Sequence, residues 1–124
     1  MAAKLAGEIA DSFSSLQGIA GVDVTLTRQD RAVTLIAVPA TTEFEVDTGD
    51  VIEYAQSRDF TILAADLVLG GFPSLPKRGD TIRETIDGVE TVYSVGAPAG
   101  SNHFKFEDPF RTVLRIYTMQ TGEG

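Results

Sequence analysis

Acidic residues gather in one short stretch of the chain, and this group of carboxylates is the pattern that comes nearest to a chemical site. Between Thr41 and Gln56 they are Glu43, Glu45, Asp47, Asp50 and Glu53. Carboxylate oxygens are the ligands that calcium prefers, but a calcium loop needs a D-x-[DN]-x-[DN]-G spacing that is missing here. We therefore predict no metal site. Although Glu43–Val46 alternates like an exposed strand, we predict that residues 41–57 form a long loop that is mobile or faces a partner.

The remaining residues give little support for catalysis. One histidine, His103, cannot build a multi-histidine metal site, and a Ser-His-Asp triad needs a positioned serine that nothing in the sequence marks. The chain has no cysteine, which excludes disulfides, thiolate metal sites and a cysteine nucleophile. Phosphate-binding glycine loops, HExxH and GxSxG are also missing. We expect His103 to be a surface loop residue, and we expect no enzymatic activity, no catalytic residue and no cofactor.

Length and composition indicate one globular domain. A chain of 124 residues is long enough for a real core but short for two domains, so we predict a single domain over residues 1–124. The hydrophobic fraction of 43% is that of a folded protein. No apolar run reaches the roughly 18 residues of a membrane span, and the N-terminus does not have the layout of a secretory signal.

The charge balance argues against specific nucleic-acid binding. The chain carries 10 basic and 18 acidic residues, a formal net charge of −8. Such a chain repels phosphates in bulk, and no cluster of Lys or Arg interleaved with aromatic residues offsets the repulsion. A protein beside DNA can still use this sign, because an acidic lumen lets DNA slide without sticking.

The clearest element is a β-hairpin over residues 76–93. Pro76 cannot continue a helix and Gly79 supplies the backbone freedom of a turn before Asp80. The pair Asp87-Gly88 favours a type I′ turn, which connects a strand over 81–86 to a strand over 90–95. We interpret four residues as scaffold of this hairpin: Gly79, Asp80, Asp87 and Gly88.

An amphipathic helix is predicted near the N-terminus, over residues 5–17. The apolar residues Leu5, Ile9, Phe13 and Leu16 recur at helical spacing, and the glycines that follow would end the helix. This helix either packs across a sheet or docks on a neighbouring subunit.

Most of the other segments alternate with a period of two, which predicts strands. Arg115 lies in the middle of one of these strands, and its guanidinium needs either an acidic partner or a solvent-exposed face of the sheet. The segment 63–67 favours one helical turn, whereas 96–108 reads as a polar loop and 121–124 as a fraying tail. The strands are expected at 22–27, at 32–38 with an end at Pro39, at 58–62 and at 112–119.

Several short motifs of the second half, in their joint order, resemble a known family. They are Arg58-Asp59-Phe60, Ala64-Ala65-Asp66-Leu67, Pro76-x-Arg78-Gly79-Asp80-x-Ile82, Tyr93-x-Val95, and Asp108-Pro109-Phe110-Arg111 leading into Leu114-Arg115-Ile116-Tyr117-Thr118. Together they make the chain similar to the small neck proteins of tailed bacteriophages: head-completion, stopper or head–tail joining proteins. The resemblance covers residues 58–119. Tyr117 and Met119 stand where those relatives have His and Lys.

The resemblance implies a fold and a place in a virion. The fold would be mainly β, a small SH3-like antiparallel barrel over residues 22–119 with the N-terminal helix and one short internal helical turn. The chain, made in the host cytoplasm, would form a homo-oligomeric ring of six copies in the virion neck. Portal or adaptor proteins would contact its head side and tail-terminator or tail-tube proteins its tail side. DNA would pass through without specific binding, and the ring would close the DNA channel.

Two alternatives remain open at this stage. A tail terminator or another tail component is close kin to a neck protein and hard to separate from it by sequence. A small β-barrel binding module belongs to a different class, and it would need a concave apolar pocket. In a ring protein, the five acidic residues Glu43, Glu45, Asp47, Asp50 and Glu53 would reach into the channel or onto a neighbouring copy.

Overall fold

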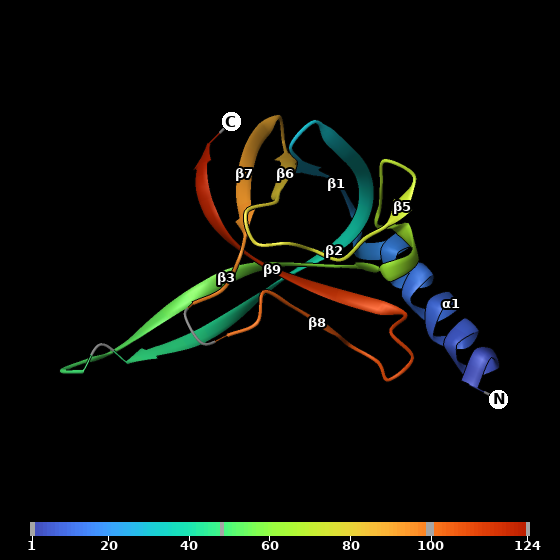
Figure 1. The fold of residues 1–124 in the computed structure, drawn as a ribbon, viewed down its shortest axis with the longest axis horizontal. Helices are drawn as coiled ribbons and strands as arrows, with labels where there is room; N and C mark the ends of the chain where they lie inside the picture. Colours follow the sequence, from blue (N-terminus) through green and yellow to red (C-terminus); the bar gives the residue numbers. More distant parts are fainter. Residues whose placement is uncertain (1, 48, 99–100, 124) are drawn as a thin grey trace.

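The fold is a small β-barrel with a helix on one side and a long two-stranded projection on the other (Figure 1). This computed structural model describes residues 2–47, 49–98 and 101–123, with side chains over 7–45, 49–98 and 101–119. The elements are α1 (Ala2–Ala20), β1 (Val22–Arg28), β2 (Arg31–Asp47), β3 (Ile52–Leu63), the 3₁₀ turn η1 (Ala64–Asp66), β4 (Val68–Leu69), β5 (Phe72–Pro73), β6 (Thr81–Ile86), β7 (Val89–Val95), β8 (Phe104–Phe106) and β9 (Val113–Glu123).

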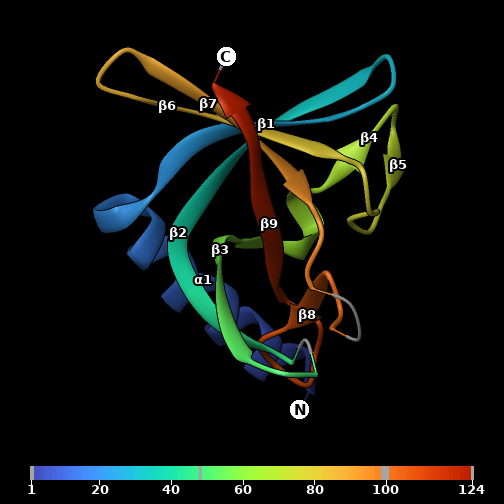
Figure 2. The same ribbon diagram turned by 90° about the vertical axis from the view of Figure 1, so that its left-hand side faces the viewer.

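Six antiparallel strands close the barrel. They follow the order β3-β2-β1-β6-β7-β9, and β9 pairs with β3 to complete the circle. Figure 2 shows β9 running the height of the barrel, from the side of β8 to the C-terminus. Closure gives each of the six strands a partner on both sides over part of its length. The predicted class, a small and mainly β barrel with an N-terminal helix and one short helical turn, is confirmed.

The core follows directly from the alternation in the strands. Phe60 and Ile62 of β3 are completely buried, as are Leu114 and Ile116 of β9. Because side chains point alternately to the two faces of a strand, these residues fill the barrel while their neighbours cover its outside. The rest of the buried core is Val24, Leu26, Leu35, Ala37, Leu67, Leu69, Ile82 and Val95.

β6 and β7 form the hairpin expected from the Asp87-Gly88 pair. Both turn residues have positive φ, 51° at Asp87 and 80° at Gly88, which is the backbone of a type I′ turn. The same backbone freedom is used at Gly79, where φ is 94° just before β6.

We expect Gly88→Ala to lower the free energy of unfolding by about 1 kcal/mol, because an L-residue is strained at this φ. Nothing lies within 4 Å of a Cβ at Gly88, so the cost is one of backbone strain alone. Gly7 in α1 is the matched control: a Cβ there also meets nothing within 4 Å, and its helical backbone predicts that Gly7→Ala stabilises the protein slightly. Urea unfolding should show that Gly88→Ala lowers the free energy of unfolding and that Gly7→Ala raises it.

Within the segment 41–57, predicted to be a long loop, residues 41–47 and 52–57 are strand, and that prediction was wrong. β2 continues through Pro39 to Asp47 and pairs with β3 in ten register positions, from Val38↔Thr61 to Asp47↔Ile52. Pro39 did not end the strand, because the last β2 residue paired with β1 is Ala37. Beyond that point β2 has a neighbour on one side only, and such an edge position tolerates a residue without an N–H.

Three other boundaries also differ. The C-terminal segment expected to fray is part of β9, paired with β7 through Gly122 and Glu123, and Gly124 lies outside the described residues. The polar loop 96–108 contains β8, which pairs with β9. The helix runs past Gly18 and ends where the Gly21 N–H donates to the Gln17 carbonyl. In each case backbone pairing extends the element beyond what its side chains predict.

Candidate functional site

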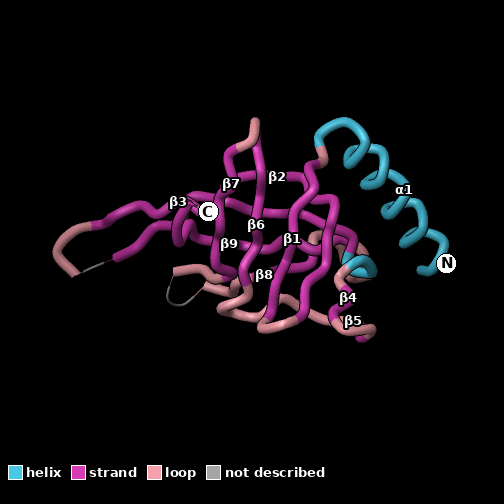
Figure 3. Tube along the Cα trace, turned by 90° about the horizontal axis from the view of Figure 1, so that it is seen from above, coloured by secondary structure: helices cyan, strands magenta, loops and turns pink. Residues whose placement is uncertain are grey.

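The most prominent feature is the projecting hairpin of β2 and β3, called the arm here and defined as residues 42–57. β3 leaves β9 at the pair Arg58↔Thr118, and from Thr42 to Asp47 the two strands pair only with each other. Six residues of strand at about 3.3 Å each make a projection of about 20 Å. Figure 3 shows the arm on one side of the barrel and α1 on the other.

All five predicted acidic residues lie on the arm. Glu43, Glu45 and Asp47 belong to β2, Asp50 to the turn, and Glu53 to β3. Residues 39–57 contain no Lys or Arg. Exposed apolar side chains accompany these acids near the tip, where Tyr54 is 67% and Ile52 53% exposed. The arm is therefore an acidic projection with an apolar tip.

A buried polar cluster holds the arm where it leaves the barrel. Asp59 is completely buried, and Arg115 of β9 donates to its Oδ2 from Nε at 2.8 Å and from Nη2 at 2.6 Å. The hydroxyls of Thr42 and Ser57 also donate to Asp59, and Arg115 Nη2 lies 3.0 Å from Thr42 Oγ1. Because these residues come from β2, β3 and β9, the cluster fixes the direction of the arm relative to the barrel.

An aromatic contact reinforces this root. The ring of Phe44 meets that of Tyr117 edge-on, with centroids 5.6 Å apart, and the Arg115 guanidinium lies 5.9 Å from the Tyr117 ring. Tyr117 is one of the two positions where the sequence departs from the neck proteins it resembles. Here it packs beneath the base of the arm.

A second ion pair lies inside the barrel. Arg58 Nη2 is 2.7 Å from Glu84 Oε2, and the Glu84 side chain is 2% exposed. Burial raises the pKa of the nearby Tyr93, and the charge of Glu84 raises it further. The phenol therefore stays neutral. We interpret Arg58, Glu84 and Tyr93 as a structural group whose buried charges are paired.

The scaffold residues of the hairpin do not join the arm. Asp80 is nearly buried and accepts from Arg28 Nε at 2.8 Å, from Arg28 Nη2 at 2.7 Å and from the Lys77 N–H at 2.9 Å. It ties β1 to the turn before β6. Asp87 and Gly88 form the tip of the β6–β7 hairpin.

The helix is only half covered by the barrel. Phe13 is buried, and the Gln17 side-chain amide donates to the Ile36 carbonyl of β2 at 2.8 Å. Leu16 remains partly exposed and Ile19 is 86% exposed. Thus α1 packs on the sheet, which is the first of the two alternatives that the sequence left open. Part of its apolar surface still faces outward.

The histidine has a structural setting. His103 Nε2 lies 2.9 Å from the Pro76 carbonyl, and its ring meets Phe104 edge-on.

Among the described residues no three His, Cys, Asp or Glu side chains gather closely enough to hold a metal ion. Within that same part of the chain, no helix has the length and apolar character of a membrane span.

Asp108 organises the turn into β9. Its carboxylate accepts from the backbone N–H groups of Thr112 and Val113, both at 2.8 Å, and of Phe110 at 3.2 Å. Loss of hydration alone would raise the pKa of Asp108, but the hydrogen bonds from Val113, Thr112 and Phe110 outweigh it and leave the pKa lowered.

We expect Asp108→Ala to lower the free energy of unfolding at neutral pH by about 1 kcal/mol, because three backbone donors lose their acceptor. A lowered folded-state pKa adds stability above the ordinary pKa of Asp, and this is lost as pH falls through the lowered value. Urea unfolding at about pH 7 and about pH 3 should therefore show a larger difference between wild type and variant at the higher pH. An equal difference at both values would contradict this role.

The sequence shows the five acidic residues of the arm, but not that they lie on a strand hairpin or which residues hold it. The position of Arg115 in mid-strand predicts a partner, yet Asp59 is 56 positions away and becomes a neighbour only through the pairing of β3 with β9. A signal did exist at Thr42, which interrupts a strand face that is otherwise apolar at Val38, Ala40 and Phe44.

These features together define a class of protein. A closed barrel whose prominent surfaces are a projecting acidic arm and a half-covered helix is suited to contact with other chains, as in structural and assembly proteins.

Comparison with known protein families shows which family this chain belongs to. The family model described as phage head-tail joining protein matches residues 8–124, nearly the whole chain, and the chain belongs to this family. No curated protein and no solved structure matched it. The protein is thus a structural component of the virion neck, where it interacts with head and tail components.

Proposed function

We propose that copies of this chain form a closed ring around the DNA channel at the head–tail junction. Portal or adaptor proteins contact its head side, and tail-terminator or tail-tube proteins contact its tail side. The motifs between residues 58 and 119 that resemble neck proteins imply six copies. The family membership supports the location, and the ring is our inference from the shape of the protomer.

The observation that carries the proposal is the pair of unlike projections on opposite sides of one barrel. The arm extends about 20 Å to one side, and α1 with its exposed Ile19 lies on the other (Figures 1 and 3). The protomer that carries them leaves the outer face of α1, at Ile19, and the tip of the arm, at Tyr54, exposed. Contacts between unlike surfaces of identical chains repeat head to tail, and they generate a ring when the rotation closes.

We further propose that this ring closes the DNA channel after packaging. A net charge of −8 repels phosphate groups, so the ring acts as a barrier that DNA does not adhere to. The same repulsion allows DNA to leave without being held once the channel opens.

The test uses DNA-filled heads from a phage that lacks this chain. Adding the purified protein is expected to produce new density at the portal vertex, to retain the packaged DNA and to allow tails to attach. Binding to the ends of isolated tails but not to heads would instead assign the protein to the tail. Binding to neither would contradict the proposed role.

A further inference from the structure

Four basic residues make no ion pair with any carboxylate whose side chain the structure describes, although the protein has a large excess of acidic residues. In the part of the chain whose side chains are described, every other Lys and Arg lies within 4.0 Å of a carboxylate. The four exceptions are exposed: Arg31, Lys77, Arg78 and Arg111. In a chain of net charge −8, cations left exposed in this way indicate a surface suited to an acidic partner.

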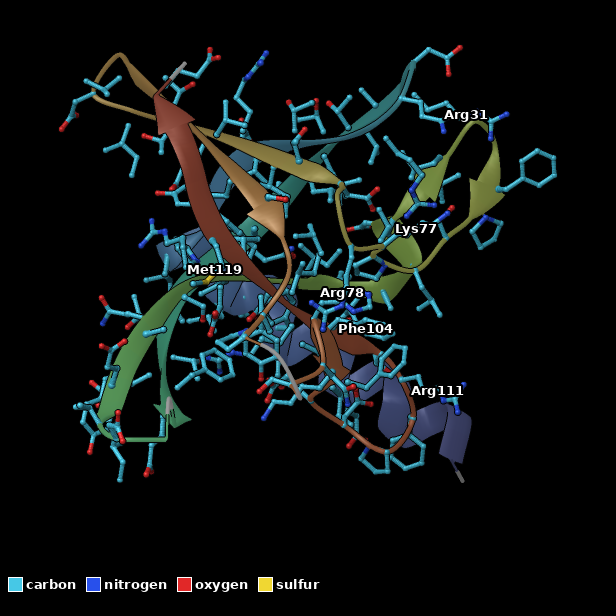
Figure 4. The ribbon with its side chains drawn as sticks, turned by 60° about the vertical axis from the view of Figure 1, so that its left-hand side comes forward. Arg31, Lys77, Arg78, Phe104, Arg111 and Met119 are labelled. Carbon is cyan, nitrogen blue, oxygen red and sulfur yellow. The ribbon has the colours of Figure 1, made fainter. Side chains whose placement is uncertain are left out.

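These four residues are called the basic face here. Arg31, Lys77 and Arg111 lie on the side of the barrel away from the arm, and Arg78 lies nearer the middle of the molecule (Figure 4). Arg31 passes so close to Gly70 that a Cβ there would be 3.0 Å from its Cδ. Arg78 donates to the carbonyls of Ala97 and Ser101, at 3.3 and 2.6 Å. Arg78 is thus held by neutral acceptors and Arg31 lies against Gly70, and neither is within 4.0 Å of a carboxylate whose side chain is described.

The basic face also carries an open apolar pocket of about 570 Å³. The Arg111 guanidinium lies over the Phe106 ring at its wall, 5.6 Å from the ring centroid. Leu75 is exposed at the pocket, and Phe72 is exposed close by in β5. The other lining residues are Ala64, Ala65, Pro73 and Ser74. An occupant of this surface should therefore combine apolar side chains with carboxylates.

The tip of the arm has this composition. Ile52 and Tyr54 are exposed there beside the carboxylates of Asp50 and Glu53. We propose that the arm of one copy docks on the basic face of the next copy. Ile52 and Tyr54 enter the pocket, and the arm carboxylates approach Arg111 and Lys77. This inference rests on the proposed ring and adds the contact that closes it.

The protomer cannot make this contact with itself. The Asp59–Arg115 cluster fixes the arm so that it points away from the barrel, and the basic face is on the opposite side. A head-to-tail ring places each arm beside the basic face of a neighbour, so every copy satisfies both surfaces. DNA is a weaker candidate for the basic face, because four cations on a chain of net charge −8 attract phosphates poorly.

The absence of cysteine allows a direct crosslinking test. The double variant Tyr54→Cys/Leu75→Cys places one thiol at the arm tip and one at the pocket, both at exposed positions. It is assembled onto DNA-filled tailless heads, oxidised and run on a non-reducing gel. We expect a ladder of covalent multimers beyond the dimer. The matched control is Tyr54→Cys/Val89→Cys, with the second thiol at the exposed tip of the β6–β7 hairpin, and we expect no ladder from it.

A reducing immunoblot of the same particles separates the possible failures. If the chain is present in the neck but gives no ladder, arm docking is wrong while the neck role stands. If the chain is absent from the particles, the proposed function fails, and arm docking with it. A missing ladder together with loss of packaged DNA in Lys77→Glu/Arg111→Glu would assign the basic face to DNA and overturn the proposal. A ladder in the control as strong as in the test pair would also overturn it.

Discussion

Replacing residues 45–54 with Asn-Gly is expected to abolish head–tail joining while the barrel stays folded. This change removes the tip of the arm and closes the remaining strands with a two-residue turn between Phe44 and Ala55, which are register partners. The removed side chains that the structure describes are all exposed, so we expect the free energy of unfolding to fall by less than about 1 kcal/mol. Joining should fall by orders of magnitude, because each copy loses the element that reaches its neighbour.

The measurement is the yield of tailed particles in complementation of a phage that lacks this chain. A matched control removes apolar surface from a different hairpin: Ile86→Ser/Val89→Ser alters the exposed tip of β6–β7 and should leave joining unchanged. Wild-type joining by the truncated protein would contradict the role assigned to the arm.

Asp59→Ala is expected to cause the largest loss of stability among single substitutions of charged residues. It leaves Arg115, Thr42 and Ser57 without their shared acceptor at the root of the arm. Removing one partner of a buried ion pair costs about 3–5 kcal/mol, and we expect about 3 kcal/mol because Arg115 can still reach water. Burial would lower the pKa of Arg115, but the hydrogen bonds and charge of Asp59, together with the charges of Glu107 and Tyr117, outweigh this and leave the pKa raised, so Arg115 stays charged.

Urea unfolding measures this loss, with Glu90→Ala as the control. Glu90 pairs with Arg83 at 2.7 Å, but both side chains are well exposed, so its loss should cost less than about 1 kcal/mol. Similar effects for the two substitutions would show that the cluster at the arm root contributes no more than an ordinary surface pair.

The barrel was predictable wherever local chemistry decides the structure. Asp87 and Gly88 specify a type I′ turn by their own backbone preferences, so the strands on both sides of them could be placed almost to the residue. Alternation of apolar residues likewise located the buried face of β3 at Phe60 and Ile62.

The arm could not be predicted, because partner strands rather than local residues create it. Pro39 and the acidic residues after it would disfavour a strand in isolation, yet pairing of β2 with β3 carries both strands far beyond the barrel. The last residues of β9 are a similar case, since Gly122 is a poor strand former that pairs with Val92 of β7.

The part of the candidate site that lies within one stretch of sequence was predictable, whereas the parts that depend on strand pairing were not. Five acids within one short stretch are visible in any sequence. The basic face draws on residues separated by up to 80 positions, of which Arg31, Lys77 and Arg111 are brought to one side only by the closed barrel. The partnership of Asp59 with Arg115 depends likewise on the register of two strands.

A cryo-EM reconstruction of the virion neck would test the central claim most directly. We predict a closed ring of this chain around the DNA channel at the head–tail junction, with the arm of each copy lying on the basic face of the next. A neck without this protein, or one in which its copies surround the channel with no contact between neighbours, would contradict the account.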